Sequence, residues 1–77
     1  MSIQIVNHVD ARGLSCPMPI VKTAQAMKTV TQGDLLEVLA TDPGAVADFA
    51  AWSRSTGNEL VETSIQDGVY RFVLRRK

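Results

Sequence analysis

Glycine and proline divide the chain into short segments, and this division constrains the fold more than any other feature of the sequence. The alternation of apolar and polar residues over positions 3–10 predicts a first strand. A second pattern, with apolar residues at helical spacing, predicts an amphipathic helix that begins at Pro17 and Pro19 and ends at Gly33. Its apolar residues are Ile20, Val21, Ala24, Met27 and Val30.

The second half of the chain repeats the change from strand to helix and then adds two strands. Residues 35–40 form a short apolar segment that is typical of a strand. Asp42 is predicted to cap a second helix, with Pro43 at its first position and Gly57 at its end. Two further strands are predicted, joined by a tight turn; they cover residues 59–65 and 69–75, and the turn is Asp67-Gly68.

The order strand, helix, strand, helix, strand, strand predicts the fold class. We expect residues 1–77 to form a single α/β (α+β) domain, a two-layer sandwich with two helices on one face of a four-stranded mixed sheet. A helix connects the first strand to the second, so these two strands are predicted to be parallel.

The charge balance and the scarcity of cysteine and histidine exclude several classes of function. Eight basic residues balance eight acidic ones, so stable binding to nucleic acid is not expected. One cysteine and one histidine cannot form a disulfide, a Cys-x-x-Cys redox pair or a familiar metal site, and we expect no cofactor. The sequence holds no apolar run long enough for a membrane span and no basic, apolar leader. We therefore expect a cytoplasmic monomer.

Cys16 is the one strongly nucleophilic side chain in the sequence, and its place before a helix is informative. Unpaired N–H groups and the positive end of the helix dipole favour a thiolate, which predicts a pKa below the usual value of about 8.5. The alternative is an inert buried thiol, which is how most free cysteines behave. The neighbouring prolines favour an exposed position.

A single exposed thiol can perform only a few reactions. A cysteine hydrolase requires a base, and His8 lies in the predicted first strand rather than beside the thiol. A dithiol oxidoreductase requires a second cysteine. What remains is a carrier, in which the thiolate accepts sulfur as a persulfide and yields it to another thiolate. Such a chain acts as a carrier rather than as a free-standing enzyme with multiple turnovers.

The residues around Cys16 resemble the opening motif of the TusA-like sulfur carrier family, also called the SirA/YedF-like family. The motif is Asp-Ala-Arg-Gly-Leu-Ser-Cys-Pro-Met-Pro at positions 10–19, and the match extends to residues 41–44 and 56–60. The resemblance implies the sandwich found in the C-terminal domain of translation initiation factor three. It also implies that Cys16 carries the persulfide, with loop support from Asp10, Gly13, Leu14, Pro17 and Pro19.

The resemblance implies protein partners rather than small-molecule cofactors. The sulfur donors would be cysteine desulfurases or rhodanese-like proteins, and DsrE-like proteins are among the related carriers' partners. The segments at 42–44 and 56–60 are more similar to the branch found in sulfur oxidisers. The alternatives are a relay toward 2-thiouridine in tRNA, supply of sulfur to the molybdenum cofactor, and a noncatalytic regulatory module. A redox sensor that forms sulfenic acid at its cysteine is a further possibility.

Four other residues are candidate contacts for a partner. Arg12 either stabilises the thiolate and meets an acidic partner or is a solvated loop charge. Asp42 has a structural alternative, a helix cap. Asp48 has another, a surface charge near the start of the second helix that the helix dipole favours. Trp52 is predicted to lie off the apolar stripe of its helix, either partly exposed as a docking residue or packed at the margin of the layers. The C-terminal end is basic, and its charges either steer a partner or are solvated charges of an edge strand; they are Arg71, Arg75, Arg76 and Lys77.

Overall fold

A computed structural model describes residues 4–77, and its order of elements matches the prediction. The elements are β1 (Ile5–Ala11), α1 (Met18–Met27), β2 (Leu35–Ala40), α2 (Ala45–Thr56), β3 (Glu59–Gln66) and β4 (Val69–Arg75). The strands form one sheet in the order β1-β2-β4-β3. The predicted parallel pairing of β1 with β2 is confirmed, and the other two pairs are antiparallel. Ile3, the first residue of the predicted strand pattern, lies outside the described residues.

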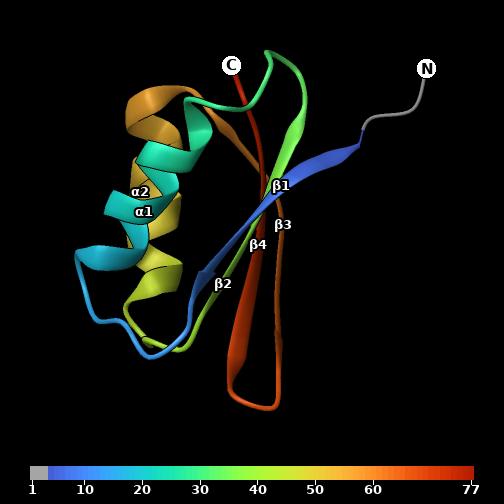
Figure 1. Ribbon diagram of the computed structural model, residues 1–77. Coiled ribbons are helices and arrows are strands. Elements are labelled where there is room, and N and C mark those ends of the chain that lie inside the picture. Colours follow the sequence, from blue (N-terminus) through green and yellow to red (C-terminus); the bar gives the residue numbers. More distant parts are fainter. Residues whose placement is uncertain (1–3) are drawn as a thin grey trace.

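Both helices cover the same face of the sheet, as Figure 1 shows, and the other face is open. The predicted two-layer α+β fold is therefore confirmed. The core lies between the layers, where Phe49 of α2 stacks on Phe72 of β4 with a distance of 4.4 Å between ring centroids. Both rings are fully buried. Alternate residues of β2 complete this core, because successive side chains of a strand point to opposite faces of the sheet.

The first helix is shorter than predicted. It ends at Met27, and the chain then turns through residues 28–34 before β2 begins. Thr29, Val30 and Thr31 are β-branched residues that disfavour helix, and the Thr29 hydroxyl donates to the Ala26 carbonyl instead. Gly33 adopts φ +88° within the turn before β2, so its predicted role as the helix end was wrong.

The inward face of α1 also differs from the predicted stripe. Pro19, Thr23 and Met27, spaced by four residues, are buried, whereas Val21 is 38% exposed. Thr23 is tolerated in the core because its hydroxyl donates to the Pro19 carbonyl at 2.8 Å. A pattern that counts only apolar residues therefore misplaces the face by about one position.

The second helix begins later than predicted. Gly44 is its N-cap residue and no side chain caps it, so the prediction of Asp42 as the cap was wrong. Residues 42–45 form a turn in which the Ala45 N–H donates to the Asp42 carbonyl at 3.0 Å. This turn separates Asp42 from the helix by two residues. At the other end, Gly57 has φ +81° and closes α2 as predicted.

The predicted hairpin between β3 and β4 is confirmed. Asp67 and Gly68 both have positive φ angles, 52° and 77°, as a two-residue type I′ turn requires. Among residues 4–77, no helix is long and apolar enough to cross a membrane.

Two loops meet at one edge of the sheet, and this edge holds Cys16. Because β1 and β2 are parallel, their carboxyl ends lie side by side, and residues 12–17 and 41–44 both leave from there (Figure 1). The Gly13 N–H donates to the Thr41 hydroxyl at 2.9 Å and ties one loop to the other.

Candidate functional site

Cys16 is exposed in the loop between β1 and α1. The alternative of a buried thiol is therefore wrong. Pro17 is the N-cap residue of α1, so the cysteine lies one position before the cap, and the peptide bond between them is cis. Two backbone hydrogen bonds fix this stretch, from Met18 to the Ser15 carbonyl at 2.9 Å and from Val21 to the Pro17 carbonyl at 3.1 Å.

Residues on both sides of Cys16 anchor its loop to the fold. Leu14 is partly buried and packs against the core, and Pro19 is buried on the inward face of α1. Gly13 has φ +79°, a conformation that glycine adopts without steric cost and that lets the chain turn before the cysteine. The loop thus holds an exposed thiol on a fixed backbone.

The electrostatic environment of the thiol is the reverse of the predicted one. The pKa of Cys16 is raised, first by a hydrogen bond to the Asp48 carboxylate, then by desolvation and by the negative charges of Asp48 and Asp42. The prediction of a lowered pKa was wrong because it considered only the start of α1. The acidic residues come from α2 and the loop before it, and they favour the neutral thiol.

Asp10 and Arg12 form an ion pair beside the loop. Arg12 Nε and Nη2 donate to the two Asp10 carboxylate oxygens at 2.8 and 2.9 Å, and the Arg12 backbone N–H donates to Oδ1 at 3.1 Å. These contacts lower the pKa of Asp10 to about 2, the side-chain hydrogen bond from Arg12 contributing most. The Asp10 carboxylate also orders the loop by accepting from the Arg12 backbone N–H.

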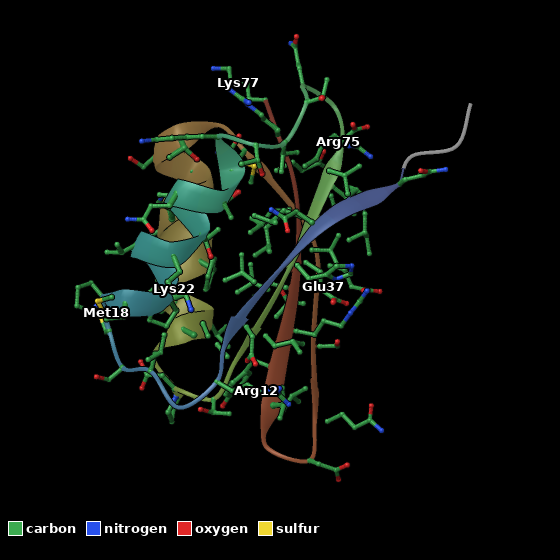
Figure 2. The ribbon with its side chains drawn as sticks, in the orientation of Figure 1. Arg12, Met18, Lys22, Glu37, Arg75 and Lys77 are labelled. Atoms are coloured by element: carbon green, nitrogen blue, oxygen red, sulfur yellow. The ribbon has the colours of Figure 1, made fainter. Side chains whose placement is uncertain are left out.

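Three exposed apolar side chains lie where the helices begin, near the cysteine loop. Met18 is 44% exposed, Val21 38% and Val46 40%. We call these three residues the apolar rim. Figure 2 shows Met18 at the loop end of α1, with Arg12 on the neighbouring stretch of chain. Apolar side chains that are exposed at the end of the molecule that holds the reactive thiol offer contact area for another protein.

The structure brings together only some of the predicted site residues. Asp42 and Asp48 lie close enough to Cys16 to change its pKa, whereas the Arg12 guanidinium pairs with Asp10. Trp52 is partly buried and packs edge to face against Phe49 near the far end of the helices. It belongs to a different part of the surface.

Sequence reasoning missed the residues that join the loops. Thr41 accepts the hydrogen bond from Gly13, and Lys22 Nζ donates to the Asp10 carbonyl at 3.3 Å. The signal that would have pointed to Thr41 is its place directly after β2, which is parallel to the strand that leads into the cysteine loop.

The site contains a nucleophile with the Asp48 carboxylate beside it, and the chain's one histidine lies elsewhere. His8 lies on the strand face away from the helices, with Nδ1 2.8 Å from Glu37 Oε1. Within residues 4–77, no three histidine, cysteine or acidic side chains are grouped so that they could hold a metal ion. An exposed thiol in such a setting can take the outer sulfur of a partner's persulfide, and the resulting persulfide can yield it to another thiolate.

Comparison with known proteins identifies the family. A family model described as sulfurtransferase TusA matches residues 7–76. The sulfur carrier protein TusA of Allochromatium vinosum is 41% identical over 69 residues, which cover 90% of this chain and 91% of that protein. YrkF of Bacillus subtilis, which bears the provisional name of a sulfur carrier protein, is 48% identical over 68 residues, 88% of this chain. The chain spans only 37% of the length of YrkF.

A solved structure supports the fold independently. The crystal structure of a SirA-like protein from Desulfitobacterium hafniense superposes with a TM-score of 0.80, covers 91% of this chain and 96% of its own, and is 21% identical. Together with the match to the family model and the identity to the TusA relative, these findings show that the chain belongs to the TusA family of sulfur carrier proteins.

Proposed function

We propose that this protein carries sulfane sulfur as a persulfide on Cys16 and delivers it to a thiol of a partner protein. The observation that carries the proposal is an exposed cysteine, the only one in the sequence, on a loop fixed to the fold. In the loading step, the Cys16 thiolate attacks the outer sulfur of a donor persulfide. A new S–S bond forms to Cys16, the donor's S–S bond breaks, and the donor cysteine leaves as a thiolate with the electron pair. No net oxidation occurs.

The thiol must lose its proton before it attacks, and its acidic surroundings oppose this step. We infer that docking of a partner promotes the loss. A basic group of the partner placed near Asp48 and Asp42 would neutralise their charge and lower the pKa of Cys16. The apolar rim offers the contact area next to that group, which fits transfer to proteins rather than to free small molecules.

The proposed partners are protein sulfur donors, either rhodanese-like proteins or cysteine desulfurases, and acceptors such as DsrE-like proteins. We place the carrier in the cytoplasm, because a free thiol stays reduced in that compartment. We also propose that it acts as a monomer. The similarity of residues 42–44 and 56–60 to the sulfur-oxidising branch favours a role in sulfur oxidation. Efficient transfer to a tRNA thiolation relay, and none to DsrE-like acceptors, would favour tRNA modification instead.

Intact mass spectrometry tests the persulfide directly. The reduced protein is incubated with rhodanese and thiosulfate, and in parallel with a cysteine desulfurase and cysteine. We expect a gain of one sulfur, about 32 Da, that a thiol reductant removes. Cys16→Ser should gain none, and the matched control Ser15→Ala should load like the parent.

Failure to load with both donors would contradict the proposal. If the donor binds both the parent and Cys16→Ala, and no sulfur is transferred to the parent, the result would support a noncatalytic interaction module. Oxidation of Cys16 by peroxide without sulfur loading would support a redox sensor.

A further inference from the structure

A hollow of about 400 Å³ lies at the end of the helix layer farthest from Cys16. It is open to solvent and is lined by the last turns of both helices, by the chain just after α2 and by the chain just after β4. In Figure 2, Lys77 marks this end of the molecule and Met18 marks the thiol end of α1. The residues that matter for its chemistry are Met27, Lys28, Trp52, Asn58, Arg76 and Lys77.

The lining of the hollow is rich in cations and hydrogen-bond donors. Lys28, Arg76 and Lys77 contribute positive charge, and no aspartate or glutamate side chain lines the hollow. Across residues 4–77, none of these three cations belongs to an ion pair. Arg76 donates from Nη1 to the Val30 carbonyl at 2.5 Å and from its backbone N–H to the Asp34 carbonyl at 3.0 Å, and its other guanidinium N–H groups have no such partner in the described part of the chain.

The side chain of Asn58 also offers a hydrogen-bond donor to the hollow. Its oxygen Oδ1 accepts a hydrogen bond from the Lys77 backbone N–H at 2.9 Å, so its amide NH₂ group remains as a donor. The Thr56 hydroxyl is the other uncharged polar side-chain group in the lining, and it already donates to the Trp52 carbonyl at 2.8 Å. The hollow therefore complements a ligand that accepts hydrogen bonds and carries negative charge.

The floor of the hollow is apolar. Met27 is 5% exposed, and the partly buried Trp52 packs edge to face on Phe49, with ring centroids 6.5 Å apart. This contact with a core residue holds the indole in place, so an apolar group can lie on it without further ordering of the protein. Tryptophan and arginine are also the residues that contribute most to binding at protein interfaces.

We propose that this hollow docks an acidic segment of a partner protein, with an apolar side chain lying on Trp52 between carboxylates that pair with Lys28 and Arg76. An open hollow would bury too little of a small free ligand, whereas a side chain on a protein surface is already positioned. A nucleic acid is disfavoured because the chain as a whole has no net positive charge. The inference goes beyond sulfur transfer, since the hollow does not include Cys16.

The chain's single tryptophan makes the test direct, because Trp52 fluorescence reports on the hollow itself. The probe is a capped peptide, Asp-Glu-Phe-Glu-Asp, and its counterpart with amides in place of the carboxylates. We expect a saturable change in emission with the acidic peptide below about 1 mM and at least about a threefold weaker response with the amide peptide. A mixed-sequence single-stranded oligonucleotide forms a third arm.

Two charge reversals locate the binding. Lys28→Glu should raise the dissociation constant of the acidic peptide at least about threefold, whereas Arg54→Glu should leave it unchanged. Both residues are exposed, both changes alter the charge equally, and Arg54 does not line the hollow. The titration is repeated with Cys16→Ser, where an unchanged response separates this inference from the sulfur-carrier proposal.

Three results would overturn the inference. They are the absence of saturable change with the acidic peptide, equal effects of the two reversals, and tighter binding of the oligonucleotide than of the acidic peptide.

Discussion

At Cys16, exposure and reactivity are separate properties. The side chain is accessible to solvent, but Asp48 and Asp42 raise the pKa of its thiol, so the empty protein holds mostly the neutral form at pH 7. Oxidants and alkylating agents react with the thiolate, and a raised pKa therefore protects the empty carrier from both. This protection disfavours a role as a peroxide sensor and fits a carrier that becomes reactive when a partner docks.

Replacing Asp48 with asparagine tests this account of the thiol. Asp48→Asn removes a negative charge and the strongest hydrogen-bond acceptor near the sulfur, so the pKa of Cys16 should fall. The measurement is the rate of iodoacetamide alkylation as a function of pH, in which the variant's inflection should lie below that of the parent. Below that inflection, each unit of lowering in pKa corresponds to about a tenfold faster reaction at fixed pH.

Asp67→Asn serves as the control, since Asp67 lies in the hairpin turn between β3 and β4. Its inflection should coincide with that of the parent. A parent inflection below about 8.5, or an Asp48→Asn inflection above that of the parent, would contradict the account.

Gly13 supports the site through its backbone conformation. Gly13 has φ +79°, so Gly13→Ala places a residue with a Cβ in the left-handed region. The substitution should lower the free energy of unfolding by about 1–2 kcal/mol, even though nothing lies within 4 Å of the added atom. The thermal midpoint should fall by at least about 4 °C for a domain of this size. Gly13→Asn should lose less, because asparagine tolerates the left-handed region. Equal losses would show that the cost comes from the added side chain and not from φ.

At the scale of elements, the hydrogen bond between Gly13 and Thr41 links the loops that precede the two helices. Thr41→Val keeps the shape of the side chain but removes the acceptor, which should cost about 0.5–1.5 kcal/mol. Hydrogen exchange at the Gly13 amide is the measurement, and its protection should be lost in the variant. Thr31→Val, on the exposed turn before β2, should leave that amide protected. Undiminished protection in Thr41→Val would mean that the loops are held by other contacts.

Elements governed by local rules were predicted well from the sequence. Asp67-Gly68 has the turn that its residue types favour, and Gly57 ends α2 in the left-handed conformation. The parallel pairing of β1 and β2 also followed from the helix between them. In the turn and at the helix end, a few consecutive residues determine the geometry. For the strand pair, the helical connection itself limits how the two strands can be arranged.

The predictions that failed depended on residues distant in the sequence. The raised pKa of Cys16 arises from Asp48, which lies 32 positions further along the chain (48 − 16 = 32) and approaches only because the two helices begin at the same edge of the sheet. The burial of Thr23 depends on the direction in which the whole of α1 faces the sheet. A motif can thus identify the reactive residue while leaving its protonation undetermined.

Over the whole molecule, one chain of hydrogen-bonded polar side chains crosses the open face of the sheet. His8 of β1 contacts Glu37 of β2, Arg71 of β4 donates to the same carboxylate, and Arg71 also pairs with Glu62 of β3. Figure 2 shows Glu37 on the sheet, away from the helices. All four strands therefore contribute to one network on the face that the helices leave uncovered.

The network makes the stability of the fold depend on pH through Glu37. Hydrogen bonds from His8 and Arg71 lower the pKa of Glu37. Its contribution is therefore fully present above the ordinary glutamate pKa of about 4.3, and it is lost as the pH falls through the lower value of the folded state. Glu37→Gln should reduce the free energy of unfolding by about 1–2 kcal/mol at pH 7, and the difference from the parent should shrink as the pH falls below about 4.

Urea denaturation at a series of pH values from 7 to about 2 measures this difference. The control is Glu59→Gln, because Glu59 pairs with a single residue among residues 4–77, Arg75, and its side chain is 61% exposed. Its effect should be smaller than that of Glu37→Gln at pH 7, since an exposed ion pair contributes little. A difference between Glu37→Gln and the parent that stays constant with pH would mean that the loss comes from altered packing. In that case the network would not couple the four strands to the charge of Glu37.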